Sequence, residues 1–96
     1  MPLVTLLLIQ GPDQGQRYEF TQDEITLGRG AVNDIQLHDT ESSRRHAFMR
    51  WTDTEGWRIT DEGSSNGTFV NGTMIRKRIL KDGDQIQIGR SILVCH

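Results

Sequence analysis

Several features that define other protein classes are scarce or missing in this 96-residue sequence. The single cysteine, Cys95, can form no disulfide within the chain, which suits a reducing compartment. The longest apolar run, residues 6–9, is too short to span a bilayer, and no basic segment precedes it as in a secretory signal. The net charge of −2 gives no overall field that would attract nucleic acid or anionic lipid. These absences predict a soluble, cytoplasmic domain without membrane or nucleic-acid partners.

Helical periodicity is missing as well. In residues 31–55, the longest span without glycine or proline, a helix would place His38, Asp39 and Ser42 on its apolar face. Strand patterns recur instead, bounded by turn-forming residues, in residues 4–10, 44–51, 56–61, 84–89 and 91–96. Asn71-Gly72 fits a two-residue hairpin turn between two short apolar stretches. The sequence therefore predicts one all-β domain, a sandwich or a barrel, over residues 1–96.

Three irregular segments are rich in polar side chains: residues 28–34, 38–47 and 61–67. Loops at one end of a sandwich converge even when they are far apart in sequence, and binding sites favour such loops. Convergence would bring together a cationic fork with hydroxyl and amide groups, namely Arg29, Ser43, Arg44, Ser65 and Asn66. This combination suits a phosphate dianion, whose oxygens accept several charge-assisted hydrogen bonds.

These segments resemble a known family. Gly-Arg at residues 28–29, Ser-Arg-Arg-His-Ala at 43–47 and DEGSSNGTFVNG at 61–72 are similar, in order and spacing, to the forkhead-associated (FHA) domain. That family binds phosphothreonine peptides. The resemblance implies an eleven-stranded antiparallel-type β-sandwich (SMAD/FHA-like) with its ligand loops at one end. It also implies that residues 1–96 are a single FHA domain, a module of a longer signalling protein.

The resemblance assigns expected roles to the candidate site residues. Arg29 matches the arginine that bridges the phosphate and the ligand backbone, and Ser43 matches the hydroxyl that binds phosphate. Arg44 would add a backbone N–H and its guanidinium, Ser65 a further contact on the phosphate side. Asn66 matches the amide that binds the ligand main chain beside the phosphothreonine. The partner is therefore expected to be a Thr-phosphorylated protein, bound by a monomer without cofactor or metal.

Other residues match positions that hold loop shape, and these are Gly28, His46, Gly67 and Asn71. In this family the third residue after the phosphothreonine usually sets specificity. Because Asp39, Glu41 and Glu62 lie in or beside the candidate loops, we expect the surface to disfavour an acidic ligand residue there.

Simpler interpretations remain for each residue. Arg29 and Arg44 could be solvated, Ser43 could cap a turn, and Asn66 could be a second turn asparagine. An enzyme using His46 with Ser43 is disfavoured, because no nucleophile elbow is present, and the spacing of histidines and cysteine makes no zinc site.

Two binding alternatives also remain. The first is a phosphate-independent interaction or oligomerisation module that uses an outer sheet face of the same fold. The second is a nucleic-acid binder using the basic run at residues 76–78 with Lys81, although aromatic residues are not interleaved there.

Overall fold

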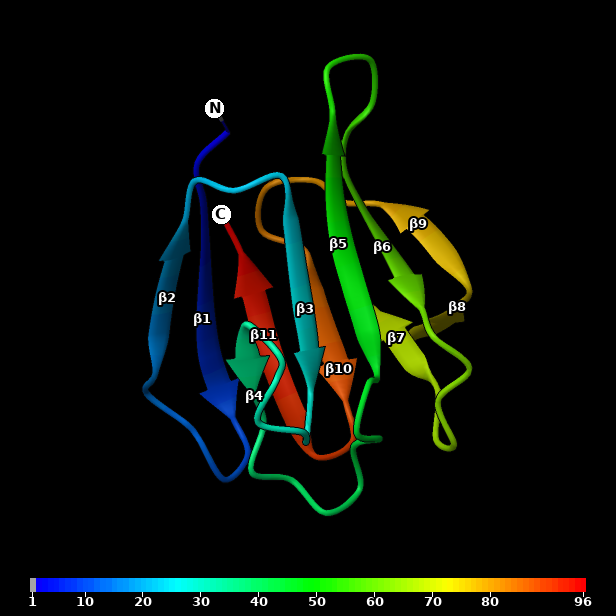
Figure 1. The fold of residues 1–96 in the computed structure, drawn as a ribbon. Coiled ribbons are helices and arrows are strands. Elements are labelled where there is room, and N and C mark those ends of the chain that lie inside the picture. The colour runs from blue at the N-terminus through cyan, green and yellow to red at the C-terminus, as the bar shows by residue number, and fades with distance from the viewer. Residues whose placement is uncertain (1) are drawn as a thin grey trace.

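The computed structural model describes residues 2–96 as two β-sheets packed face to face (Figure 1). Sheet A contains, in spatial order, β2 (Arg17–Phe20), β1 (Val4–Gln10), β11 (Ser91–Cys95), β10 (Gln85–Ile88), β7 (Thr68–Val70) and β8 (Thr73–Ile75). Sheet B contains β4 (Ile35–Gln36), β3 (Glu24–Gly28), β5 (Ala47–Thr52), β6 (Gly56–Asp61) and β9 (Lys77–Ile79). The expected eleven-stranded sandwich is confirmed. Met1 lies outside the described residues.

The core lies between the sheets because alternate side chains of each strand point inward. In β1, Val4, Leu6 and Leu8 are buried, whereas Ile9 is 38% exposed. Fully buried aliphatic side chains come from both sheets and include Leu6, Leu8, Ile25, Leu27, Met49, Ile59, Ile86, Ile88 and Leu93. Burial of each such side chain stabilises the fold by roughly 1.5–3 kcal/mol before entropy costs. The core therefore holds the two sheets together and supports the loops at their ends.

The strand expected over residues 44–51 begins later than its sequence pattern predicts. β5 starts at Ala47, because the backbone just before it belongs to a loop contact. The carbonyl oxygen of Arg44 accepts hydrogen bonds from Gly30 N at 3.0 Å and from Asn33 Nδ2 at 2.8 Å. The sheets also contain one parallel pair, β3 with β4, among otherwise antiparallel neighbours.

The hairpin predicted at Asn71-Gly72 is confirmed between β7 and β8. Asn71 has φ 51° and Gly72 has φ 85°, which are the positive values that a type I′ turn requires at both central positions. Asn71 also fixes the start of β10, since Gln85 N donates to its Oδ1 at 3.0 Å. Its Nδ2 donates to Asp84 Oδ1 at 3.0 Å.

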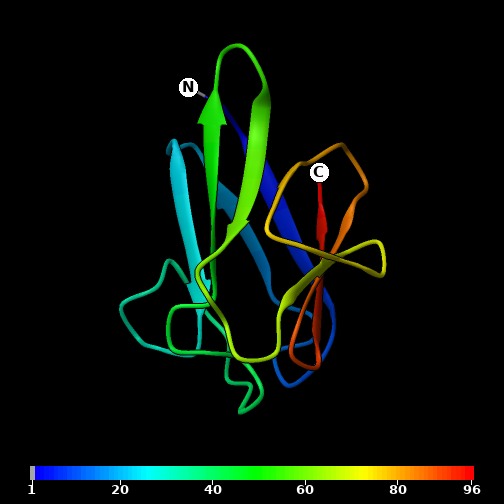
Figure 2. The ribbon, with the colours of Figure 1, turned by 90° about the vertical axis from the view of Figure 1, so that its right-hand side faces the viewer.

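The strand directions gather the polar segments at one end of the sandwich. β3 and β6 run toward this end and β5 runs away from it, so the connections β3–β4, β4–β5 and β6–β7 lie there together (Figures 1 and 2). The turn between β10 and β11 lies at the same end, and the two chain termini lie at the opposite end (Figure 1). The described residues 2–96 include no helix that could cross a membrane.

The buried position of Cys95 gives a test of this fold. Burial, with smaller effects of Asp84 and Asp82, raises the pKa of the Cys95 thiol to about 11. Because the thiolate is the reactive form, we expect iodoacetamide at pH 8 to alkylate native Cys95 at least about 100-fold more slowly than the urea-unfolded chain. Mass spectrometry of timed samples measures both rates, and similar rates would contradict the placement of β11.

Candidate functional site

Backbone hydrogen bonds join the loop after β3 to the loop before β5. Arg29 N donates to Ser43 O at 2.9 Å, and Gly30 N donates to Arg44 O at 3.0 Å. Gly28 stands where the two loops touch, and a Cβ built on it would lie 2.3 Å from Arg44 O. Only glycine fits this close approach of the two loops.

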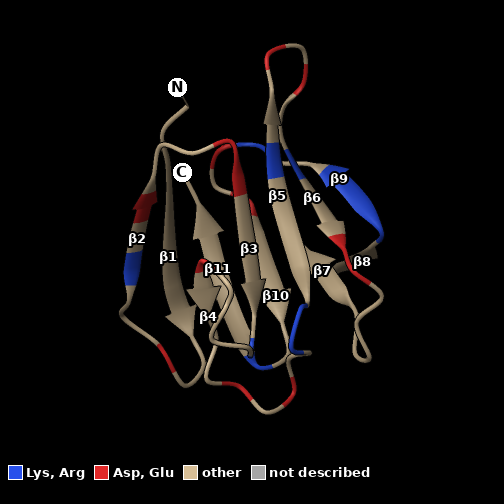
Figure 3. Cartoon of the chain, viewed as in Figure 1, with Lys and Arg blue, Asp and Glu red and all other residues tan. Residues whose placement is uncertain are grey.

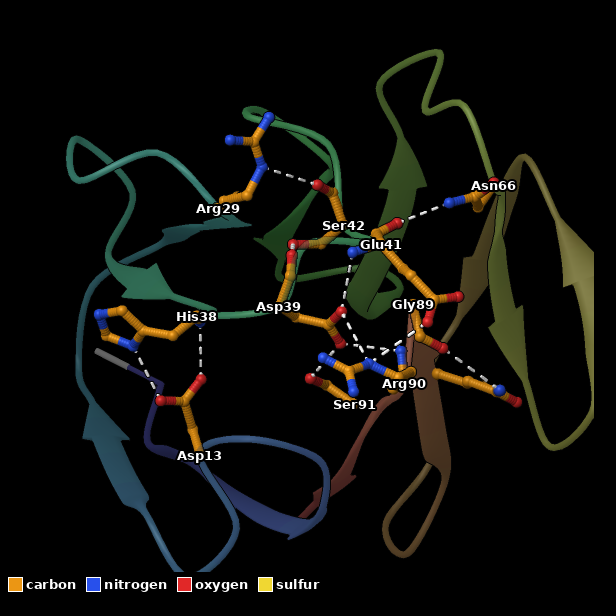
Figure 4. Close-up of polar contacts among 11 residues, drawn as sticks. Asp13, Arg29, His38, Asp39, Glu41, Ser42, Asn66, Gly89, Arg90 and Ser91 are labelled. Atoms are coloured by element: carbon orange, nitrogen blue, oxygen red, sulfur yellow. Dashed lines mark hydrogen bonds and ion pairs between the residues drawn. The ribbon is translucent and has the colours of Figure 1, made fainter.

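The side chain of Arg29 is held from one side only. Its Nε donates to Ser42 O at 3.2 Å, while its two terminal nitrogens point away from the loop (Figure 4). Ser42 itself is buried, and its hydroxyl donates to Asp39 O at 2.6 Å, consistent with a structural role. The anchored Nε orients the guanidinium and leaves its terminal N–H groups as a fork for an anion.

The β6–β7 loop meets the β4–β5 loop through Ser65 and Asn66. Ser65 N donates to Ser43 Oγ at 3.1 Å, so the Ser43 hydroxyl still has its own proton to donate. Asn66 Nδ2 donates to Glu41 O at 2.7 Å, which leaves the amide oxygen and a second N–H (Figure 4). The loop contacts thus bring Arg29, Ser43, Ser65 and Asn66 to the same end of the sandwich. The side chain of Arg44 is exposed and lines a hollow beside residues 30–32 of the β3–β4 loop.

His46 joins the β4–β5 and β6–β7 loops through the two nitrogens of its buried ring. Its side chain is 0% exposed. Nδ1 accepts from Ser43 N at 3.0 Å, so the ring proton belongs on Nε2, which donates to Gly67 O at 2.8 Å. Gly67 has φ +87°, a value that suits glycine. His46 and Gly67 thus join the β4–β5 and β6–β7 loops, whereas the side-chain hydrogen bonds of Asn71 reach the start of β10.

Asp61 organises the β6–β7 loop, a role that the sequence analysis did not assign. Its carboxylate accepts from Gly63 N and Ser64 N at 3.0 and 3.1 Å, and from the hydroxyls of Ser64 and Thr68 at 2.5 and 2.7 Å. Burial pushes the pKa of Asp61 upward, but these hydrogen bonds outweigh it and lower the pKa. The sequence does indicate this role, because Asp followed two residues later by Gly-Ser is typical of an Asx-turn, in which the Asp side chain accepts from the backbone.

Asp39 is the second organising carboxylate, and it is 0% exposed. Its Oδ1 accepts from Glu41 N at 2.9 Å, and its Oδ2 accepts from Arg90 N and Ser91 Oγ, each at 2.8 Å (Figure 4). Burial raises the pKa of Asp39, but these hydrogen bonds and the charge of Arg90 together lower it. Asp39 therefore ties the loop that carries Ser43 to the β10–β11 turn.

The buried position of Asp39 changes the expectation about ligand specificity. Asp39 presents no charge at the surface, and Arg90 Nε lies 3.3 Å from Glu41 Oε2. Of the acids expected to repel an acidic ligand residue, Glu41 is thus partly neutralised and Glu62 is exposed. The negative charge that could repel an acidic ligand residue is therefore smaller than the sequence analysis expected.

The arrangement presents several hydrogen-bond donors that suit an anion. The exposed end carries a guanidinium fork, hydroxyls and an amide on loops that buried polar residues hold in place. Within residues 2–96 no group of three or more His, Cys, Asp or Glu is placed to hold a metal ion. The His46 ring nitrogens are both engaged by backbone groups, so this ring is not available as a base for Ser43.

The role of Asp39 is testable by its acid dependence. We expect Asp39→Asn to lower the free energy of unfolding by about 1–3 kcal/mol at pH 7, because an amide cannot accept all of these hydrogen bonds. The lowered pKa of Asp39 means that its stabilisation is present above about pH 4 and is lost as pH falls through the folded-state value. The difference between the variant and wild type should therefore narrow below pH 4. Urea unfolding at several pH values measures both free energies of unfolding, with the exposed Glu19→Gln as the control variant. A difference between Asp39→Asn and wild type that does not change with pH would contradict the role of the Asp39 carboxylate.

Comparison with known proteins places the chain in a family. The FHA domain model matches residues 25–89. The oxoglutarate dehydrogenase inhibitor of Corynebacterium efficiens is 41% identical over 96 residues, which are 98% of this chain and 67% of that protein. The chain spans 67% of the length of this inhibitor and 54% of the length of GarA of Mycobacterium tuberculosis, which is 39% identical over 89 residues.

Solved structures give the same result. A chain from a structural and functional analysis of phosphothreonine-dependent FHA domain interactions superposes with a TM-score of 0.87 at 34% identity, covering 99% of this chain and 96% of that one. Mycobacterium tuberculosis EmbR, solved in complex with a low-affinity phosphopeptide, has a TM-score of 0.89 at 32% identity, covering 100% of this chain and 24% of that chain. With its motifs, fold and loop contacts in agreement, the chain belongs to the FHA-domain family.

Proposed function

We propose that this domain is a phosphorylation-dependent interaction module that binds phosphothreonine-containing segments of partner proteins. The observation that supports this most is the convergence of the Arg29 fork with the hydroxyl of Ser43 and the loop of Ser65. Phosphothreonine presents a charge of about −1.5 to −2 and three acceptor oxygens, which match these donors. The solved relatives include domains described in terms of phosphothreonine-dependent interaction and phosphopeptide binding.

The individual residues act as follows in this proposal. The terminal nitrogens of Arg29, the Ser43 hydroxyl, the Arg44 N–H and the Ser65 side chain bind the phosphate. Asn66, held by Glu41 O, binds the ligand main chain with its remaining amide groups. The position of Asn66 beside Ser65 sets the direction in which a bound peptide leaves the phosphate. As in the family, we expect threonine to be preferred over serine.

The magnitudes are compatible with reversible signalling. Each charge-assisted hydrogen bond contributes about 1.5–3 kcal/mol. Four such contacts contribute on the order of 6–12 kcal/mol, against association costs of at least about 4 kcal/mol. With main-chain contacts through Asn66, a total near −8 kcal/mol corresponds to about micromolar affinity. The unmodified peptide lacks most of these contacts, so binding depends on a kinase.

The wider assignments are part of the same proposal. We propose a monomeric, non-enzymatic domain of a longer cytoplasmic signalling protein, without a cofactor and without nucleic-acid or membrane partners. Relatives named as an inhibitor of oxoglutarate dehydrogenase and as a regulator of glycogen accumulation support a regulatory rather than a catalytic role.

Replacing the cationic fork tests the proposal. We expect Arg29→Ala to weaken binding of a degenerate phosphothreonine peptide pool at least about tenfold, because the strongest charge-assisted contacts are lost. Isothermal titration calorimetry measures the affinity, with the unmodified pool as ligand control. Arg17→Ala, an exposed arginine on β2 of sheet A, serves as the matched variant and should bind like wild type. Equal binding by Arg29→Ala and wild type would contradict the assignment of the site.

A further inference from the structure

A second charged surface lies on the outer face of sheet B, away from the β3–β4, β4–β5 and β6–β7 loops, which we call the FHA loops. A hollow of about 260 Å³ there is lined by Phe48, Arg50, Thr52, Arg58, Thr60 and Lys77, and we call it the basic basin. Figure 3 shows its Lys and Arg positions along β5, β6 and β9, with the FHA loops at the lower end. The lining contains no acidic residue, although the whole chain has a net charge of −2. The basin is thus a local concentration of positive charge.

The sheet register places two like charges directly opposite each other in the basin, because Arg50 on β5 pairs with Arg58 on β6. A third cation, Lys77 on β9, pairs with Thr60, two residues along β6 from Arg58. Directly opposed side chains have Cβ atoms about 4.5–5.5 Å apart, and like charges at this spacing are destabilising. A bound anion would relieve this repulsion.

Two acidic side chains at the border of the basin form ion pairs with its two arginines. Arg50 reaches Glu24 Oε2 at 2.6 Å on β3, and Arg58 reaches Glu55 Oε1 at 2.5 Å in the β5–β6 hairpin. In the described part of the chain Lys77 forms no ion pair. The Arg50 guanidinium carbon lies 5.4 Å from the centre of the Phe48 ring, so the aromatic floor holds this cation in place.

We propose that the basic basin binds an unphosphorylated acidic segment of a partner protein, independently of the phosphothreonine loops. Carboxylates form paired, charge-assisted hydrogen bonds with guanidinium groups, and Phe48 offers apolar contact between them. A nucleic acid fits less well. A hollow of this size takes one or two side chains, and Glu24 and Glu55 at its border would repel a phosphate backbone that continued past it. The surface gives the domain a contact that does not depend on a kinase.

The test uses a synthetic unphosphorylated peptide of alternating Glu and Ser, with a Gln-for-Glu peptide of equal length as control. Titration of the isotope-labelled domain is followed by two-dimensional NMR of backbone amides. We expect saturable shifts centred on β5, β6 and β9 with the Glu peptide and none with the Gln peptide. Lys77→Glu and Arg58→Glu should each weaken binding about tenfold, whereas Arg17→Glu on sheet A should leave it unchanged.

Several outcomes would overturn the proposal: no saturable shifts, shifts centred on the FHA loops, binding of the Glu peptide by both basin variants with wild-type affinity, or tighter binding of a DNA duplex to the same face. The NMR spectrum of each variant shows whether it is folded. Both basin variants should retain wild-type affinity for the phosphothreonine pool, so failure of this proposal is distinguishable from failure of the phosphopeptide site.

Discussion

The contacts of one neutral imidazole hold the candidate site together. His46 accepts a hydrogen bond from Ser43 N and donates one to Gly67 O, so a single buried ring fixes the distance between the β4–β5 and β6–β7 loops. Asp39 ties the β4–β5 loop to the β10–β11 turn, and Asp61 accepts hydrogen bonds within the β6–β7 loop. The exposed donors are therefore preorganised, and little ordering cost remains when an anion binds. In the proposed function, binding of phosphothreonine thus depends on buried polar residues that do not themselves face the ligand.

Sequence patterns predicted the core of the fold better than its boundaries. The patterns at residues 56–61 and 84–89 predicted strands, and β6 and β10 form there with Trp57 and Ile86 buried on one face of each strand. The count of eleven strands came from the family resemblance, since strands as short as β4 leave no periodic signal. The start of β5 was misplaced because Arg44 O bonds to the neighbouring loop, a long-range contact that local pattern does not encode.

The motifs identified the exposed members of the site and the buried His46, but they did not identify the roles of Asp39 and Asp61. Arg29, Ser43 and Asn66 lie in short motifs whose spacing is typical of the family. Asp39 looked like a surface acid, because sequence alone does not show that the β10–β11 turn supplies Arg90 N and Ser91 Oγ as donors. Pairing across 51 and 52 residues is a property of the folded sandwich. The FHA loops could thus be recognised from sequence motifs, whereas the basic basin becomes visible only when the strands of sheet B are paired.

The central claim is that the FHA loops form a pocket complementary to a phosphate dianion. The most direct measurement is the second pKa of a phosphothreonine peptide, followed by ³¹P NMR as pH is varied, free and bound. The free phosphate titrates near pH 6. We predict that binding lowers this pKa by at least about one pH unit, because the Arg29 fork and the loop N–H groups favour the dianion. A bound phosphate that titrates as it does in free solution would contradict the account.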